Sequence, residues 1–272
     1  SIADKVLLMS AFDAIEDSQS SAVSLIGERN TPLHVCSIES LKGSLFLCGA
    51  YELQEGGEGL ESGCAGRLGS LTIYDGGATI AKWSEVGRSQ PCEIVEVGSC
   101  EMDGGVLDCK VLGGDVVGTA LSSGCLRIDK MDNLDNGEGN VHFSMLAEAR
   151  KEEEGLFLSV DWEPGPLALT TNNSSVGKIV TSTQQSSLLL FDVACLNADS
   201  DPLVHIRDAH EFTGEAVPAW IAAFDPHNPS RILSGGDDCA LKAWDLRSSC
   251  LIAKNTKSHD AGVTSIQFHP QR

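Results

Sequence analysis

An all-β fold is predicted by three features of the sequence. The segment Leu233 to Arg247, LSGGDDCALKAWDLR, is typical of two short strands joined by an Asp-rich tight turn, and it closes on Trp244-Asp245. A His-led loop begins upstream at Ala209-His210. A second His-led segment, SHDAGVTSIQFHP, runs from Ser258 to Pro270. This order of loop, strand, turn and Trp-Asp strand predicts WD repeats, each forming one blade of a β-propeller.

The spacing inside this repeat also predicts a buried polar relay. A loop His, a strand Ser, a turn Asp and a strand Trp can satisfy one another's hydrogen-bonding groups inside a blade. We expect a structural rather than catalytic role for such residues. The predicted relay residues are His210, Ser234, Asp237 (with Asp238 as the alternative), Trp244 and, at the head of the next repeat, His259.

Fainter copies of the repeat precede this one. They close on Asp75, Asp129 and Asp192, and with Asp245 these positions lie 54, 63 and 53 residues apart. A repeat without insertions takes roughly 40–45 residues. We place the excess in polar loops, and residues 52–66 are predicted to form an inserted flexible loop. The predicted strand segments are Leu45 to Leu53, Gly66 to Asp75, Gly105 to Gly113, Asp115 to Gly124, Cys125 to Lys130, Leu156 to Pro164 and Lys178 to Ala194.

The domain prediction is a single, incomplete WD-repeat β-propeller over residues 1–272, with about four blades and the start of a fifth. Residues 1–30 are expected to form a lead-in segment, either helical or extended. Ser258 to Pro270 supplies the first strand of the fifth blade in this interpretation. An open arc leaves strand edges unpaired, so we expect the chain to be part of a longer protein.

Composition excludes several classes of protein. The chain has 272 residues and a net charge of −20, from 39 acidic and 19 basic residues, which argues against nucleic-acid binding. An acidic surface suits solubility or a cationic partner. No apolar run is long enough to span a bilayer, so we expect no membrane association. The ten cysteines form no CxxC pair, which favours reduced thiols, a cytoplasmic location and no metal site.

The residues of the last repeats point to a particular protein family more specifically than the general repeat pattern does. AHEF and AWIAAFD (within Ala209 to Asp225), SGGDDCALKAWDLR (Ser234 to Arg247) and SHDAGVTSIQF (Ser258 to Phe268) resemble the central blades of the diphthine methyl ester hydrolase family. These are the WD-repeat proteins of diphthamide synthesis. The resemblance spans roughly residues 34 to 270, with weaker matches in LCGAYEL, GRLGSLTIYD and LFLSVDWEPG.

The sequence also departs from the family's pattern. Thr213 to Pro218 form an insertion, Cys239 stands where a WD turn usually has Gly, and Ala240 stands where Thr is common. The family's later blades are absent from this sequence.

The resemblance implies a reaction. It is hydrolysis of the methyl ester of diphthine methyl ester on translation elongation factor 2, with methanol and diphthine as products. The implied protein needs no cofactor and is a monomer at full length. WD repeats also serve as non-catalytic adaptors that bind partner proteins through a propeller face, and this alternative stays open. Neither a GxSxG elbow nor an HExxH motif occurs in the sequence.

Candidate site residues are few. Glu211 and Asp238 are candidate catalytic carboxylates, with a solvated loop and the relay as their structural alternatives. Trp220 is the candidate substrate-binding residue, because the implied substrate carries a trimethylammonium group and an aromatic face suits such a cation. Packing is the alternative for Trp220. Trp83, Trp162 and Trp244 are interpreted as core or relay residues.

Overall fold

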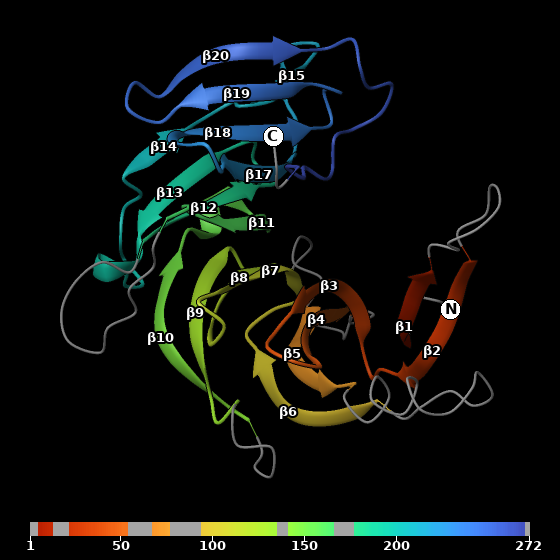
Figure 1. Cartoon of the computed structure of the whole chain (residues 1–272). Helices are drawn as coiled ribbons and strands as arrows, with labels where there is room; N and C mark the ends of the chain where they lie inside the picture. Colours follow the sequence, from red (N-terminus) through yellow and green to blue (C-terminus); the bar gives the residue numbers. More distant parts are fainter. Residues whose placement is uncertain are drawn as a thin grey trace, which may run out of the picture.

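The computed structural model describes residues 5–12, 22–53, 67–76, 94–134, 141–165 and 177–269, and for residues up to 29 it describes the backbone alone. Four antiparallel sheets of four strands form an open arc (Figure 1). Two short hairpins and two single turns of 3₁₀ helix complete the described residues, among which no α-helix occurs. The predicted all-β fold of propeller blades is therefore confirmed.

Each blade is a meander of consecutive strands. The first blade contains β3 (His34–Ser40), β4 (Leu45–Leu53), β5 (Arg67–Asp75) and β6 (Val95–Met102). The second contains β7 (Val106–Leu112), β8 (Val116–Leu121), β9 (Cys125–Asp132) and β10 (His142–Arg150). The third contains β11 (Phe157–Trp162), β12 (Lys178–Thr183), β13 (Leu188–Asp192) and β14 (Val204–Ile206). The fourth contains β17 (Ala219–Asp225), β18 (Asn228–Gly236), β19 (Leu241–Asp245) and β20 (Cys250–Asn255).

Short elements connect or precede the blades. The lead-in segment contains an antiparallel hairpin of β1 (Lys5–Phe12) and β2 (Ala22–Asn30), so its described part is extended. A hairpin of β15 (Glu211–Phe212) and β16 (Glu215–Ala216) accounts for the inserted residues before β17. The 3₁₀ turns are η2 (Glu152–Glu154) and η3 (Val193–Cys195). Of the predicted loop 52–66, Glu52 and Leu53 belong to β4, and residues 54–66 lie outside the described residues.

The prediction of a strand in Ser258 to Pro270 is wrong for the residues that the structure describes, 258–269. A strand is defined by a ladder of hydrogen bonds to a neighbour. Here the Val263 N–H donates to the Gly236 carbonyl over 3.0 Å, and no ladder develops along the segment. The segment instead lies against the fourth blade, where Val263 contacts Gly235 of β18 and residues 264–268 line a cavity together with residues of β17.

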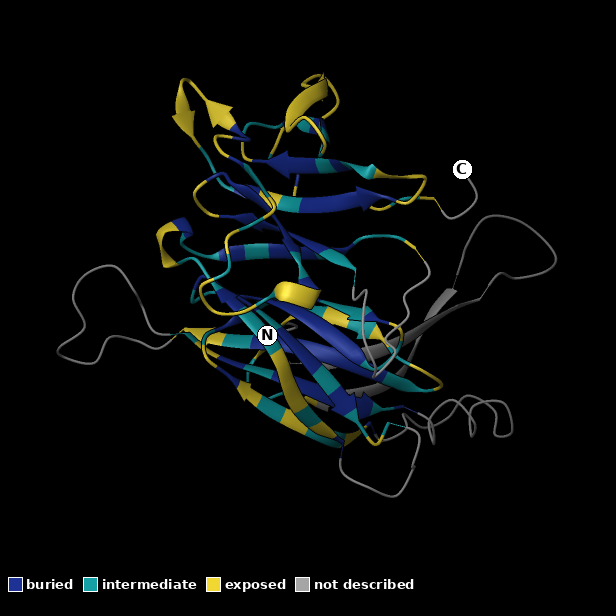
Figure 2. Ribbon diagram, turned by 90° about the vertical axis from the view of Figure 1, so that its left-hand side faces the viewer, coloured by how far each residue is buried: buried dark blue, intermediate teal, exposed yellow. Residues whose placement is uncertain are grey.

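Apolar strands hold neighbouring blades together. Every residue of β8 is buried, because the second blade packs on the first through one face and on the third through the other. The close approach leaves no room at Gly118, where an added Cβ would lie 2.6 Å from Ile179 Cδ1 and 3.0 Å from Trp162 Cζ2. Figure 2 shows the buried residues running along the middle of the sheets.

Strand register corrects one predicted repeat boundary. Asp75, Asp192 and Asp245 each face the first paired residue of the preceding strand, namely Leu45, Lys178 and Arg231. In the second blade that position belongs to Lys130, which faces Val116. Asp129 therefore occupies the place that Tyr74, Phe191 and Trp244 hold in the other blades. It is fully buried there, paired with Arg127 over 2.8 Å.

The innermost strands β3, β7, β11 and β17 lie side by side along the concave edge of the arc (Figure 1). Short polar side chains bridge them by accepting hydrogen bonds from backbone N–H groups of the neighbouring inner strand. Because these bridges fix the spacing of the inner strands, they also set the walls of the space that the strands enclose. They run from Cys109 N to Ser37 Oγ (3.2 Å), Val160 N to Asp108 Oδ2 (3.0 Å), Ala222 N to Ser159 Oγ (2.9 Å) and Phe224 N to Asp161 Oδ2 (2.7 Å).

Candidate functional site

The predicted relay exists in the fourth blade, with one change of member. His210 Nε2 lies 2.8 Å from Ser234 Oγ, which also accepts the Trp244 indole N–H over 2.9 Å. His210 Nδ1 lies 2.6 Å from Asp238 Oδ1. The turn carboxylate of the relay is therefore Asp238, and the prediction of Asp237 in this role is wrong.

Lys242 extends the relay. Its ammonium group lies 2.7 Å from Asp238 Oδ2 and donates to the Ala209 carbonyl over 2.6 Å. The sequence signal for Lys242 is its position two residues before Trp244, which places both side chains on the same face of β19. The structure shows that Lys242 is buried there.

Burial lowers the pKa of His210, and the neighbouring Asp238 only partly opposes this. For Asp238, burial favours the protonated form, but hydrogen bonds from Lys242 and His210 bring its pKa below the ordinary value. Neutral His210 and ionised Asp238 are thus locked inside the blade. Asp238 is consequently a structural residue, and its role as a catalytic candidate is not supported.

Two more predicted residues lie elsewhere. His259 is exposed in the segment after β20 and makes no part of the relay, so that prediction is wrong. The cause is the missing ladder described above, since a blade His is buried only when its repeat forms a sheet. Glu211 is exposed on the β15–β16 hairpin and lies outside the residues that line the cavities described below.

Turn geometry separates the two adjacent aspartates. Cys239 adopts a left-handed backbone conformation, with φ of 57°, which is why a Gly is usual there. The turn directs Asp238 into the blade and Asp237 toward Trp220, whose indole N–H donates to Asp237 Oδ1 over 2.6 Å. Trp220 is 37% exposed, so it is a surface residue held in place by this bond rather than a core residue.

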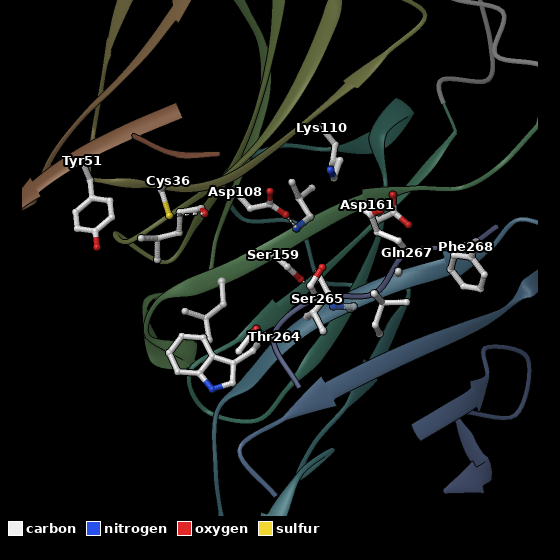
Figure 3. A pocket seen from close by; sticks show the side chains of 18 residues that line it. Cys36, Tyr51, Asp108, Lys110, Ser159, Asp161, Thr264, Ser265, Gln267 and Phe268 are labelled. Carbon is white, nitrogen blue, oxygen red and sulfur yellow. Dashed lines mark hydrogen bonds between the residues drawn. The ribbon is translucent and has the colours of Figure 1, made fainter. Parts of the chain in front are cut away.

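A cavity of about 650 Å³ lies along the inner strands. Its walls come from β3, β4, β7, β11 and β17, and residues 264–268 cover one side (Figure 3). Trp220, the candidate substrate-binding residue, is among the residues that line it. The charged groups that line it are Asp108, Lys110 and Asp161.

The two carboxylates of the cavity have different surroundings. Burial raises the pKa of Asp108, although several donors oppose this. Burial also raises the pKa of Asp161 to about 6, against hydrogen bonds from the Phe224 and Trp162 backbone N–H groups. Lys110, on β7, forms an ion pair with Glu39. Its positive charge also favours the ionised forms of both cavity carboxylates.

Asp108, Lys110 and Asp161 belong to no sequence motif and are not among the predicted site residues. The available signal was a charged residue within an otherwise apolar strand segment, in VLDCKVL and FLSVDW. A buried charge requires a partner or a function. Whether the charge has a partner or a function depends on the direction of its side chain. Strand alternation does not predict that direction here, because strands between blades are buried on both faces.

Among the described residues, no group of three or more His, Cys, Asp or Glu side chains could hold a metal ion. The eight cysteines that the structure describes are free thiols. No helix found in the described ranges has the length and apolar character of a membrane span.

Comparison with known proteins relates the chain to two curated relatives. It is 26% identical over 242 residues to a diphthine methyltransferase homolog of Dictyostelium discoideum, covering 84% of this chain and 60% of the relative. It is 29% identical over 243 residues to the diphthine methyltransferase of Homo sapiens, covering 84% of this chain and 49% of the relative. The chain thus spans about half the length of the curated relatives it matches.

Other comparisons add less. A chain in the crystal structure of the mitotic checkpoint complex aligns with a TM-score of 0.49 and 14% identity, over 75% of this chain and 51% of that one. No protein-family model matches the sequence. The similarity to proteins named for diphthine confirms the resemblance predicted from the sequence.

Proposed function

We propose that this chain acts in diphthamide biosynthesis, by hydrolysing the methyl ester of diphthine methyl ester on translation elongation factor 2. The products are methanol and diphthine. Two relatives named for diphthine, each aligned over 84% of the chain, support the pathway. The reaction is supported by one observation above all: the inner-strand cavity combines carboxylates, an ammonium group and an aromatic face.

Ester hydrolysis needs a group that activates water and a positive group near the developing oxyanion. Asp108 and Asp161 are the cavity carboxylates, and Lys110 is its ammonium group. The implied substrate also presents a trimethylammonium cation, which has no hydrogen-bond donors. The partly exposed ring of Trp220, which lines the cavity, suits that cation.

The relatives' names describe methyl transfer, which is a different reaction. Transfer adds a methyl group and consumes a methyl donor, whereas hydrolysis removes one and consumes water. The two reactions therefore change the substrate's mass in opposite directions. We place the hydrolysis in the cytoplasm, where the elongation factor acts, and expect a monomeric protein that needs no added cofactor.

Mass spectrometry of the substrate tests this proposal. Purified protein is incubated with methyl-esterified elongation factor 2, with and without S-adenosylmethionine. Hydrolysis predicts a loss of one CH₂ unit from the modified histidine and release of methanol, without the methyl donor.

Three outcomes would contradict it. No loss at a protein concentration near that of the substrate would overturn the hydrolase. Methyl gain that depends on the donor would assign the transferase reaction. Binding of the factor without any mass change would favour the adaptor.

A further inference from the structure

A second, smaller cavity adjoins the site. It encloses about 310 Å³ and is lined mostly by aromatic and proline side chains, which come from the ends of β11 and β17, the residues just after them and the covering segment. Asp161 and Phe268 both line the two cavities, and among the described residues that line the smaller one Asp161 is the only carboxylate. Asp161 stands next to the end of β11, close to Phe268 of the covering segment (Figure 3).

Comparison with Asp108 shows what is particular about Asp161. Both carboxylates occupy inner strands and bridge to the next blade through one oxygen. The other oxygen of Asp108 receives the Ser37 hydroxyl over 3.0 Å and the Cys109 N–H over 2.9 Å. Asp108 is thereby enclosed by protein donors and has the properties of a structural bridge.

Asp161 lacks that enclosure. Its Oδ2 accepts the Phe224 N–H over 2.7 Å, and the Trp162 N–H also donates to the carboxylate. Among the described residues no side-chain hydroxyl does for Asp161 what Ser37 does for Asp108. A carboxylate oxygen can accept more than one hydrogen bond, so Asp161 keeps capacity for a water molecule in the cavity.

We infer that Asp161 is the general base of the proposed ester hydrolysis, and this inference rests on the proposed function. Asp161 accepts a proton from a cavity water, and the oxygen of that water attacks the ester carbonyl carbon. The carbonyl electron pair moves to the oxygen, and the ammonium group of Lys110 in the same cavity stabilises the resulting negative charge.

The second step returns the proton. The tetrahedral intermediate collapses, the bond to methoxide breaks, and protonated Asp161 gives its proton to the leaving oxygen. Methanol departs, the carboxylic acid product ionises in solvent, and Asp161 is again a carboxylate. Water and ester are consumed, and acid and methanol are formed.

The electrostatic surroundings suit this role. A general base is most effective when its pKa lies near the working pH, and burial brings the pKa of Asp161 to about 6. Groups that face it are Asp108 and Lys110 from β7, with Glu39 of β3 beside Lys110. His227 after β17 and His269 of the covering segment line the smaller cavity with it.

The test compares kinetics of Asp161→Asn with those of the wild type on methyl-esterified elongation factor 2. Asn keeps a carbonyl oxygen for the Phe224 N–H, so the bridge between blades is preserved. We expect kcat to fall at least about 100-fold with little change in KM. Asp132→Asn is the matched control, because Asp132 of β9 pairs with Lys130 of β9 and Ser144 of β10, and none of the three lines either cavity.

A pH profile separates a catalytic from a merely structural role. Wild-type kcat/KM should fall tenfold per pH unit below about pH 6, because protonated Asp161 cannot accept a proton. The residual rate of D161N should lack this acidic limb, whereas D132N should retain it.

Each other result is decisive. Wild-type activity with undiminished kcat in D161N overturns the base and leaves the proposed function standing. If D161N proves unfolded by circular dichroism, a wild-type profile without the acidic limb overturns the base. Absence of wild-type hydrolysis overturns both proposals.

Discussion

At the scale of single residues, neighbours in sequence have unrelated roles. Asp238 lies inside the fourth blade between His210 and Lys242, while Asp237 lies outside it and fixes the Trp220 indole. One left-handed residue, Cys239, completes the turn that separates them. The sequence pattern predicts that such a turn contains a relay Asp. It does not distinguish Asp237 from Asp238, because the two differ only in the direction that the backbone gives their side chains.

The relay should contribute strongly to stability. Ser234 Oγ is bonded to both His210 and Trp244, and all three side chains are buried. Ser234→Ala leaves two buried polar groups without partners, at a cost of about 2–3 kcal/mol of unfolding free energy. Urea denaturation followed by fluorescence measures this. Ser248→Ala, at an exposed turn, is the control, and an equal effect of both substitutions would contradict the relay's role.

Trp220 should affect substrate binding and not the fold. Its side chain is 37% exposed and its indole N–H is hydrogen-bonded to Asp237. We expect Trp220→Ala to raise KM about tenfold, the loss of roughly 1–2 kcal/mol of cation–π energy, with the thermal midpoint nearly unchanged. Trp220→Phe keeps an aromatic face and should recover part of the loss. A marked fall of the thermal midpoint in both variants would instead assign Trp220 to packing.

At the scale of secondary-structure elements, the spacing between blades depends on small residues. Gly118 of β8 faces the third blade, where its missing side chain makes room for Ile179 and Trp162. Gly118→Ala should lower the unfolding free energy by about 1–3 kcal/mol, because the buried Ile179 and Trp162 side chains must shift to admit a methyl group. Gly165→Ala has open space around the new Cβ and serves as the control. Equal stability of the two variants in urea would contradict this tight contact.

Strands were easier to predict than their register. The segments that form β4 and β5 are predicted from turns and apolar runs, and their bounds agree closely with the structure. The segment from Leu233 to Arg247 contains β19 and the end of β18, but β18 already begins at Asn228. Asp129 was misplaced because an Ile-Asp pair resembles an aromatic-Asp pair until the partner strand shows which residue faces which. The segment after β20 was predicted as a strand from its residues, but a strand also needs a partner.

The relay should make the fourth blade sensitive to acid. Burial lowers the pKa of His210 below its ordinary 6.5, so the unfolded chain binds a proton there that the folded chain does not. Stability from this residue is present above pH 6.5 and is lost as pH falls through the folded value. His210→Gln should flatten the dependence of unfolding free energy on pH by up to about 1.4 kcal/mol per pH unit. Identical slopes in the two proteins, measured between pH 7.5 and pH 5 by urea denaturation, would contradict it.

At the scale of the whole molecule, the arc of blades gathers the chemistry on its inner strands. The same polar side chains that bridge β7 to β11 and β11 to β17 also line the cavity. This dual use explains why the site escaped sequence analysis. Asp108 and Asp161 are both charged residues in apolar strands that line the cavity. Only the assembled arc shows that, among the described residues, Asp108 also accepts a side-chain hydroxyl, whereas Asp161 accepts backbone N–H groups alone.

The net charge of −20 lets solubility and steering be separated by experiment. An acidic protein attracts a cationic target over distances of the Debye length, about 10 Å at 0.1 M salt and about 3 Å at 1 M. If the charge guides a cationic substrate, kcat/KM for methyl-esterified elongation factor 2 should fall steeply between 0.05 M and 0.5 M salt. A small uncharged methyl ester should show a flat profile over the same range, because its encounter involves no net charge. Parallel profiles for the two esters would show that the acidic surface serves solubility alone.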